Sequence, residues 1–250
     1  MKGTYSIGVD IGGTNTDIGL VRDDGKIIDQ ANLHTDDYWD AELYVRDMAQ
    51  KITGLLQKNK VTKIEGIGIG APNGNYYTGS IDKAPNLNFK SQVKLVEMMK
   101  QYIDAKVVVS NDANAAAYGE MIYGGAKDLD HFITFTLGTG VGSGIVIDRK
   151  LILGSTSTAG ELGHSIIIIN GRECGCGRKG CLETYTSARG IRRTARELIE
   201  MSPLYDGILK DIPAEKLSAK MVGDAANAGD PIGRQTCENG GYLLGIAIAH

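Results

Sequence analysis

Residues suited to chemistry are concentrated between Leu137 and Glu183. The stretch opens with a glycine-rich turn, Gly138-Thr139-Gly140-Val141-Gly142-Ser143-Gly144. Glycine in such a turn leaves backbone N–H groups open to phosphate oxygens. Two glutamates and a histidine follow, at Glu161, His164 and Glu183. Carboxylates and imidazole suit hydrogen bonding to vicinal hydroxyls, so a polyol or sugar is the expected ligand, although each glutamate taken singly also fits a solvated surface acid.

The same stretch contains a cysteine cluster. Cys174, Cys176 and Cys181 follow His164 and together offer three thiolates and one imidazole. This ligand set is typical of a closed tetrahedral structural zinc site, and the intervening glycines let a short knuckle wrap the ion. The alternative is chance clustering of thiols. The remaining cysteine, Cys237, is predicted to be a small core residue.

A second glycine turn lies near the N-terminus, at Gly12-Gly13-Thr14-Asn15. Both glycine turns are expected to join two strands, which argues against the P-loop and Rossmann fingerprints, whose glycines precede a helix. Each turn alone fits an ordinary hairpin, but their repetition with threonine favours phosphate binding. Asp10, which precedes the first turn, either caps the turn or holds Mg²⁺ through water.

A further acid, Asp112, follows a predicted strand over residues 106–110. Ligands gather at the carboxyl ends of strands in open α/β sheets. A carboxylate there can accept the proton of a substrate hydroxyl. The competing interpretation is a helix N-cap, formed by Asn111 or Asp112 ahead of an alanine-rich helix.

Hydrophobic patterning predicts an α/β protein in which an antiparallel meander precedes alternating helices and strands. A second strand–turn–strand around Gly138 suggests a weak internal duplication. The last predicted helix begins at Asp230-Pro231, an N-cap followed by proline. The predicted strands are 5–10, 17–21, 26–31, 64–70, 106–110, 131–137, 143–148 and 165–169, and the helices 40–59, 91–102, 188–201, 214–228 and 230–250.

Composition excludes several classes of protein. The 250 residues carry a net charge of −3 without a long Lys/Arg run, which argues against a nucleic-acid-binding surface. No apolar stretch reaches membrane-spanning length, and the early strand leaves no room for a signal peptide, so we expect a cytoplasmic protein. The sequence ends inside an apolar helical pattern, from which we expect a C-terminal truncation.

Several motifs together resemble those of the ROK sugar kinases, within the actin/hexokinase/Hsp70 superfamily. The resemblance covers the whole chain. It implies two ribonuclease-H-like α/β domains with a cleft between them: a small N-terminal domain over residues 1–111, and a larger one over 112–250 that carries the zinc knuckle. The matching runs are Asp10 to Asn15, Asn111 to Asn114, Leu137 to Gly142, Glu161 to His164, and Cys174 to Glu183.

The resemblance also implies residue roles. Asp112 matches the catalytic base, and Asp10 the carboxylate associated with Mg²⁺. Phosphates of ATP would lie on the two glycine turns, and His164 would bind zinc with one ring nitrogen and a sugar hydroxyl with the other. The ATP set is Asp10, Gly12, Gly13, Thr14, Asn15, Gly138, Thr139 and Gly140; the sugar set is Asn86, Asn111, Asp112, Glu161, His164 and Glu183; the zinc set is His164, Cys174, Cys176 and Cys181.

The implied activity is ATP-dependent phosphorylation of a hexose 6-hydroxyl, with glucose to glucose 6-phosphate, a step of glycolysis, as first choice. N-acetylmannosamine, N-acetylglucosamine and fructose are alternative substrates. A non-catalytic sugar sensor on the same scaffold is a further alternative, whereas an actin- or chaperone-like ATPase leaves the sugar and zinc sets unexplained. The family suggests a homodimer or homotetramer.

One departure from the family pattern lies in the expected sugar loop. Family members usually show Pro-Gly after the strand that ends at Gly70, but here the pair is Pro72-Asn73. The difference is expected to alter the geometry of this loop.

Overall fold

The computed structural model describes residues 3–89 and 91–249, which fold into two compact units. The first lies within residues 1–134 and 144–160, and the second within residues 135–143 and 161–250. The chain therefore passes from one unit to the other within a single hairpin and again after Gly160.

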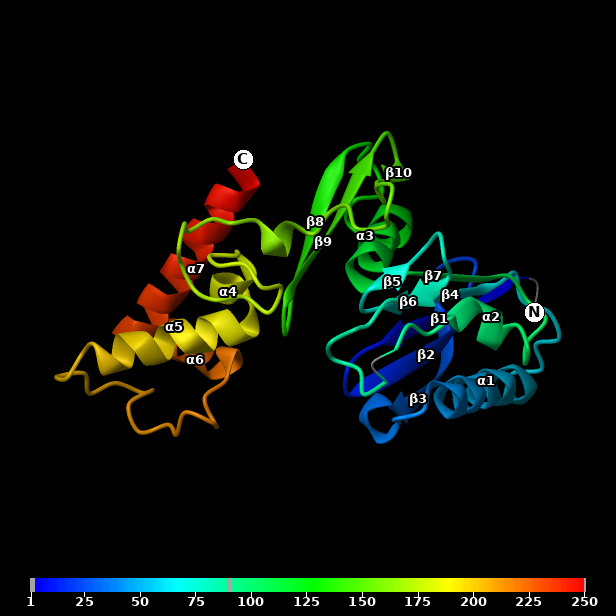
Figure 1. The fold of residues 1–250 in the computed structure, drawn as a ribbon, viewed down its shortest axis with the longest axis horizontal. Helices are drawn as coiled ribbons and strands as arrows, with labels where there is room; N and C mark the ends of the chain where they lie inside the picture. The colour runs from blue at the N-terminus through cyan, green and yellow to red at the C-terminus, as the bar shows by residue number, and fades with distance from the viewer. Residues whose placement is uncertain (1–2, 90, 250) are drawn as a thin grey trace. The chain divides into compact units, whose positions relative to one another are not determined.

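A five-stranded sheet in the order β3-β2-β1-β4-β7 forms the centre of the first unit (Figure 1). β1, β2 and β3 are antiparallel, whereas β4 and β7 continue the sheet in parallel with β1. The predicted meander followed by an α/β layer is thus confirmed. The strands are β1 (Tyr5–Ile11), β2 (Asn15–Arg22), β3 (Ile27–His34), β4 (Ile67–Ala71) and β7 (Val107–Asn111).

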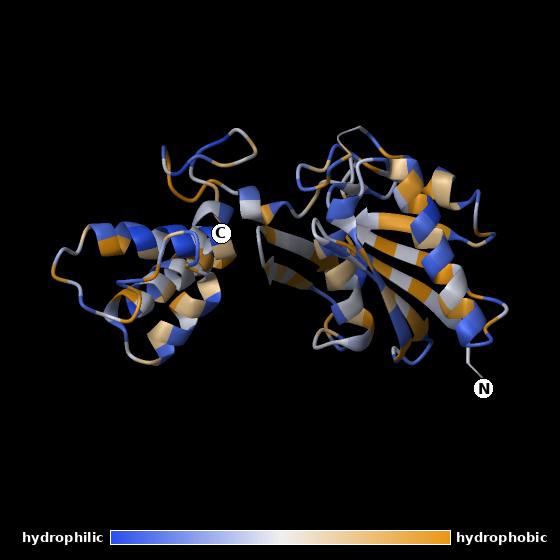
Figure 2. Cartoon of the chain, turned by 90° about the horizontal axis from the view of Figure 1, so that it is seen from below, coloured by the Kyte–Doolittle hydropathy of each residue, from blue (hydrophilic) through white to orange (hydrophobic). Residues whose placement is uncertain are grey.

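One face of this sheet packs against α1 (Ala41–Lys58). Alternate strand residues such as Ile7, Val9 and Ile11 are buried, and Figure 2 shows the resulting alternation of hydrophobic and hydrophilic positions along the strands. On α1, Tyr44 is fully buried, whereas its neighbour Leu43 is 46% exposed. The helix begins after Asp40, whose side chain accepts hydrogen bonds from two backbone N–H groups.

The opposite face contacts α3 (Asp112–Tyr123), which packs against β4 and β7. Because of this packing, α3 belongs to the first compact unit. The expected division into domains over residues 1–111 and 112–250 stays a prediction. The predicted helix over 91–102 is wrong in extent, since only α2 (Leu95–Met99) is helical. Small elements complete the unit: η1 (Thr35–Asp37), β5 (Gly74–Asn75), β6 (Ser80–Ile81) and β10 (Lys150–Leu151).

The second strand–turn–strand is also confirmed. β8 (Phe132–Leu137) and β9 (Val141–Ile147) are neighbours in a three-stranded sheet with β10. Their outer halves belong to the first unit, and the glycine turn between them belongs to the second.

Helices dominate the second unit, whose buried hydrophobic cluster is small. α7 begins at the predicted Pro231, and the Asp230 carboxylate accepts the N–H of Gly233 at 2.8 Å, which confirms the N-cap. The described part of the chain contains no helix long and apolar enough to cross a membrane. The elements are η2 (Leu162–His164), α4 (Glu183–Thr186), α5 (Ala188–Glu200), α6 (Ala219–Asn227) and α7 (Pro231–Ala249).

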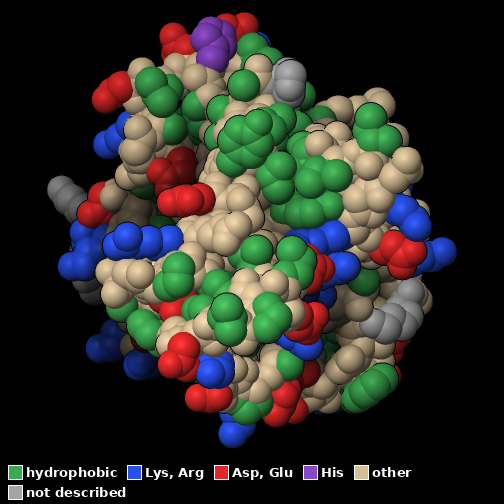
Figure 3. Space-filling model, turned by 90° about the vertical axis from the view of Figure 1, so that its left-hand side faces the viewer, with side chains coloured by type: hydrophobic (Ala, Val, Ile, Leu, Met, Phe, Trp, Pro, Cys, Tyr) green, Lys and Arg blue, Asp and Glu red, His purple; other side chains and the backbone are tan. Residues whose placement is uncertain are grey.

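Two predictions for the second unit are wrong. Residues 165–169 form no strand; the backbone N–H groups of Ile167 and Ile168 instead donate to Gly180 O, and Ile169 is 85% exposed. Cys237 is exposed on α7 rather than a core residue. Exposed hydrophobic side chains recur in this unit, and Figure 3 shows hydrophobic side chains gathered on one face of the molecule.

Candidate functional site

Acidic side chains of the first unit meet at one edge of the five-stranded sheet. Asp10 lies at the end of β1 and pairs with Gly70 of β4, which in turn pairs with Ser110 of β7. Asp112 follows two residues later, at the start of α3. The carboxyl ends of these parallel strands therefore bring Asp10 and Asp112 to the same edge.

The charges at this edge interact. Burial raises the pKa of Asp10 above its usual value, and the carboxylates of Asp112 and Asp17 raise it further. A divalent cation would relieve this repulsion, and carboxylate oxygens are the ligands that Mg²⁺ takes. The donor set therefore fits a magnesium ion held at Asp10, directly or through water.

The residues at the start of α3 divide two roles between them. The Asn111 side chain caps the helix, accepting the N–H groups of Ala113 at 2.9 Å and Asn114 at 3.4 Å. Asp112 is exposed, and among the described residues the hydrogen bond to its carboxylate is that from Ala113 N–H to Oδ1, at 2.8 Å. Helix capping therefore falls mainly to Asn111, and Asp112 keeps a carboxylate oxygen available to a ligand.

The first glycine turn lies beside the predicted sugar residue Asn86. Gly12 N–H donates to Asn15 O at 2.9 Å and closes the turn. A Cβ at Gly13 would lie 2.9 Å from Asn86 O, so only glycine permits this approach. The structure thus brings together Asp10, the turn from Gly12 to Asn15 with its exposed Thr14, and Asn86.

The loop that departs from the family pattern adopts a conformation suited to glycine. Asn73 has φ +52°, in the left-handed region, which asparagine tolerates better than most residues. Its side-chain nitrogen also donates to Asp82 O at 3.1 Å. Asn73 therefore serves where glycine is usual, and it adds a hydrogen bond across the loop.

The second glycine turn is held by the C-terminal unit. Gly138 N–H donates to Gly140 O at 3.0 Å, and Gly138 O accepts the N–H of Ala188, the first residue of α5, at 2.9 Å. Glu183 Oε2 accepts the N–H of Val141 at 2.9 Å. A Cβ at Gly140 would lie 2.4 Å from that same oxygen. One oxygen of the predicted sugar ligand Glu183 is thus engaged in positioning the turn.

The segment from Glu161 to His164 is packed against the same turn. Leu162 N–H donates to the buried Ser143 Oγ at 3.1 Å, and His164 N–H donates to Glu161 O at 3.0 Å. A Cβ at Gly163 would lie only 2.1 Å from the backbone oxygen of Val141, so this position requires glycine. Within the second unit, the turn and the three predicted sugar residues Glu161, His164 and Glu183 therefore form one folded block.

The predicted metal ligands also converge. The ligand atoms of His164, Cys174, Cys176 and Cys181 all lie within 4.8 Å of one another. His164 Nδ1 is 3.5 Å from Cys174 Sγ, and Cys176 Sγ is 3.7 Å from Cys181 Sγ. A zinc ion about 2.3 Å from sulfur and about 2.0 Å from nitrogen holds tetrahedral ligands roughly 3.5–3.8 Å apart. The four residues therefore fit structural zinc, with Nδ1 on the metal side.

The three thiols differ in acidity. Burial raises the pKa of Cys181 to about 12 and also raises that of Cys174. Burial opposes ionisation of Cys176 as well, but hydrogen bonds from Arg178 lower its pKa to about 6. Zinc would bind all three as thiolates, because metal binding displaces thiol protons.

Sequence reasoning missed one polar residue that supports this block. Arg172 stacks on the Tyr185 ring, with 4.6 Å from its guanidinium carbon to the ring centre, and donates to Thr184 O and to Glu197. Its side chain is only 10% exposed. These contacts join the knuckle to α4 and α5, and no local pattern distinguishes this arginine in the sequence.

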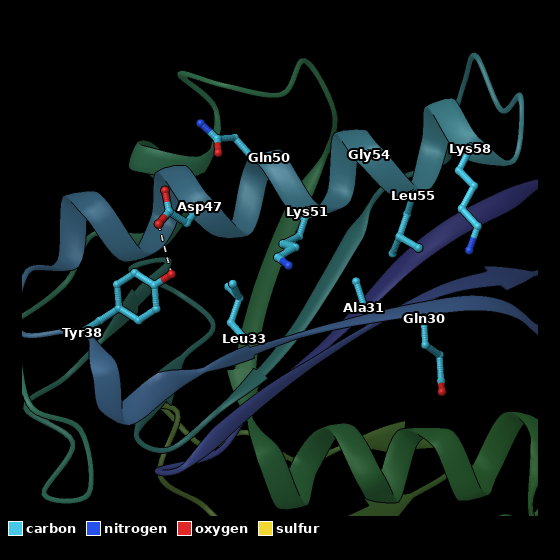
Figure 4. Close-up of a pocket in the computed structure, with 10 residues that line it drawn as sticks. All are labelled: Gln30, Ala31, Leu33, Tyr38, Asp47, Gln50, Lys51, Gly54, Leu55 and Lys58. Atoms are coloured by element: carbon cyan, nitrogen blue, oxygen red, sulfur yellow. Dashed lines mark hydrogen bonds between the residues drawn. The ribbon is translucent and has the colours of Figure 1, made fainter.

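A cavity of about 460 Å³ lies between β3 and α1 of the first unit (Figure 4). Leu33 and Leu55 contribute apolar surface, Lys51 and Lys58 contribute charge, and Tyr38 donates to Asp47 at 3.0 Å. None of the predicted ATP, sugar or zinc residues lines this cavity.

Together, these features define a class: a mixed α/β protein of the actin/hexokinase type, with two strand-joining glycine turns. The chain belongs to the ROK family, whose sequence model matches residues 6–250. A glucokinase of Halalkalibacterium halodurans is 34% identical, over 100% of this chain and 77% of its own length.

Two solved structures support this assignment. A ROK family glucokinase from Streptomyces griseus in complex with glucose and AMPPNP is 33% identical, with a TM-score of 0.79, over 98% of this chain and 78% of its own. A ROK family transcriptional regulator, a homolog of the E. coli MLC protein, is 26% identical, with a TM-score of 0.87, over 99% of this chain and 62% of its own.

Proposed function

We propose that this protein is an ATP-dependent hexose kinase that phosphorylates the 6-hydroxyl, with glucose as the first substrate to test. The observation that carries the proposal is the position of Asp112: its carboxylate is exposed at the strand edge beside Asp10 and the first glycine turn, while Asn111 caps the helix. Similarity to two glucokinases supports the choice of glucose.

In the proposed reaction, Asp112 accepts the proton of the sugar 6-hydroxyl as that oxygen attacks the γ-phosphorus. The new O–P bond forms while the bond from phosphorus to the bridging β–γ oxygen breaks, and ADP leaves. Backbone N–H groups of the turns at Gly12–Asn15 and Gly138–Gly140 bind phosphate oxygens. Mg²⁺, held at Asp10, would supply charge neutralisation.

The sugar is assigned to Asn86, Asn111, Glu161, His164 and Glu183. The remaining polar group of Asn111 is its amide N–H₂, because its oxygen caps α3, so it can donate to a sugar oxygen. His164 Nδ1 faces the cysteines, which leaves Nε2 for a hydroxyl. Structural zinc at His164, Cys174, Cys176 and Cys181 would hold this ring in place. We further propose a cytoplasmic homodimer or homotetramer.

A screen of hexoses with ATP and Mg²⁺ tests the proposal. ADP release should depend on added sugar and be greatest with glucose, and a product assay should place the phosphate on the 6-hydroxyl. Greater turnover with N-acetylmannosamine, N-acetylglucosamine or fructose would keep the kinase but change the substrate.

The second candidate is a sugar-responsive regulator without catalysis. The observation favouring it is the likeness to a transcriptional regulator, whose TM-score of 0.87 exceeds the 0.79 of the glucokinase. Sugar binding by calorimetry without sugar-dependent ADP release across the whole panel would support the regulator and contradict the kinase.

A further inference from the structure

Three buried hydroxyl groups lie together beneath the first glycine turn. Thr16 of β2 and Tyr44 of α1 are 0% exposed, and Thr35 of η1 is 1% exposed. Thr16 Oγ1 is 2.8 Å from Thr35 Oγ1 and 2.5 Å from the Tyr44 hydroxyl oxygen. Three elements therefore meet through side-chain hydrogen bonds at a site that water does not reach.

Two members of this cluster are connected to the backbone of the first glycine turn. Thr16 immediately follows Asn15, the last turn residue, and pairs across the hairpin with Ile11, which precedes Gly12. Thr35 N–H donates to Thr14 O at 2.8 Å. Two of the three hydroxyl-bearing residues are thus bonded or joined directly to the backbone that carries the turn.

The third residue, Tyr44, is itself held in place by aromatic packing. Its ring centre lies 5.3 Å from that of Tyr38 and 5.4 Å from that of Phe89. Phe89 lies in the same segment as Asn86, whose backbone oxygen is against Gly13, and Asn88, whose side chain donates to Asp36 O at 2.8 Å. Tyr44 therefore packs against the segment that carries a predicted sugar ligand, and its hydroxyl reaches the turn through Thr16.

Hydroxyls at these positions fix geometry in a way that apolar side chains would not. A buried hydroxyl is costly unless it is hydrogen-bonded, and a hydrogen bond is directional, so the cluster favours one arrangement of the three elements. Phosphate recognition by a turn depends on backbone N–H groups that are already aimed at the oxygens. A turn fixed by the buried hydroxyl cluster therefore has its N–H groups oriented for phosphate binding before the ligand arrives, whereas a mobile turn does not.

We infer that Tyr44 is a positioning residue: through Thr16 and Thr35, it holds the first glycine turn in the geometry that binds the phosphate chain of the nucleotide. The inference rests on the proposed kinase function and extends it to residues that touch neither substrate.

The test compares Tyr44→Phe with Tyr38→Phe in the full chain. Both changes remove one tyrosine hydroxyl and keep the ring, and the two rings pack together. The Tyr38 hydroxyl, however, donates to Asp47 of α1 (Figure 4) and not to a residue of the cluster. Dissociation constants for Mg²⁺–AMPPNP and for glucose are measured by calorimetry, together with KM for ATP, KM for glucose and Tm.

Tyr44→Phe should raise the AMPPNP dissociation constant and KM for ATP about fivefold, the effect of one hydrogen bond, and leave glucose binding unchanged. Tyr38→Phe should change neither constant. Thr16→Val should reproduce the Tyr44→Phe effect, and Thr16→Ser, which keeps the hydroxyl, should restore most of the affinity.

A lower Tm in Tyr44→Phe without a change in AMPPNP affinity would overturn the inference, because a purely structural hydroxyl predicts that result. Equal effects on ATP and glucose would overturn it as well. A parent protein that binds no AMPPNP would overturn the proposed function and the inference together. If the parent binds AMPPNP and Tyr44→Phe binds it equally well, the inference alone is overturned.

Discussion

The two units place their functional residues by different means. In the first unit, a continuous hydrophobic core between α1 and the five-stranded sheet fixes the strand ends, and Asp10 and Asp112 follow from strand order. The second unit has a small core around Leu209, Val222 and Ile232. There, polar contacts of Glu183, Arg172 and the cysteine cluster hold the turn and the predicted sugar residues.

This difference teaches which perturbations each unit should resist. A hydrophobic sheet core is insensitive to chelators and to moderate acid, because it holds few titratable groups. A unit held by a cysteine cluster that fits zinc and by the buried carboxylate of Asp230 should respond to both chelators and acid. Chemistry assigned to the first unit should therefore be separable from stability, whereas in the second unit function and stability should change together.

The largest expected effect tests the separable side of this comparison. Asp112→Asn should lower turnover about 10²–10⁴-fold, since the general base is lost, and leave Tm and AMPPNP binding unchanged, since Asn111 caps α3. Steady-state kinetics and calorimetry measure both. Asp104→Asn, at another exposed acid of the same unit, is the control, and parent-like turnover in Asp112→Asn would contradict the base assignment.

Loss of zinc should affect the second unit selectively. We expect one zinc per chain by elemental analysis. Cys176→Ser should remove it and lower the thermal transition of the second unit by about 10 °C or more, while the transition of the first unit stays in place. Cys237→Ser makes the same chemical change at an exposed helix position and should alter neither quantity. Metal-free protein purified without chelator would contradict the zinc knuckle.

A smaller effect is expected at Asp230, a buried carboxylate of the second unit. It accepts the Tyr205 hydroxyl at 2.6 Å and the N–H groups of Ile208 and Gly233, each at 2.8 Å. Asp230→Ala should lower the free energy of unfolding by about 1–3 kcal/mol in urea titrations at neutral pH. Asp211→Ala, an exposed acid, should lower it by less than about 0.5 kcal/mol.

The same carboxylate should make the second unit sensitive to acid. Burial opposes ionisation of Asp230, but its hydrogen bonds, first that from Tyr205, lower its pKa below 3.8. A depressed folded-state pKa stabilises the fold above the unfolded-state value and loses that contribution as pH falls through the folded value. The difference in free energy of unfolding between the parent and Asp230→Ala should therefore become smaller below pH 3.8. A free-energy difference that grows as pH falls would contradict this account.

The smallest effect is expected in the loop of the first unit at Asn73. Because φ is +52°, Asn73→Gly should change the free energy of unfolding by less than about 1 kcal/mol. Asn73→Ala should cost more, about 1–2 kcal/mol, since alanine resists the left-handed region. Equal stabilities of the two variants in urea would show that backbone conformation does not decide this position.

Local patterns in the sequence predicted the elements whose causes are local. Short apolar runs separated by turns predicted β1 to β3, and the candidate caps, Asn111 or Asp112 and then Asp230, predicted the starts of α3 and α7. The spacing of His164 and the three cysteines predicted their convergence. In each case, the decisive residues lie within a few positions of one another or form a known ligand set.

Predictions failed where distant partners decide the structure. The predicted strand over 165–169 has strand propensity, but in the described chain its backbone partners in the knuckle are Gly180 O, Leu182 N–H and one isolated bridge from Ile166 to Cys181, so no ladder forms. The contact of Thr16 with Tyr44 spans 28 residues, and nothing local announces it. From the sequence, Asn111 was predicted as a sugar ligand or as one of two possible caps of α3; in the structure, its side chain caps the helix.

The Asn111 cap of α3 has a consequence for the evolution of this protein. Residue 112 carries the proposed chemistry, yet its neighbour maintains the helix, so substitutions at 112 should not force a trade between activity and folding. A lineage could lose phosphoryl transfer at this single position and keep an intact sugar-binding scaffold. Within a family whose relatives include both kinases and regulators, this gives a short mutational route from one to the other.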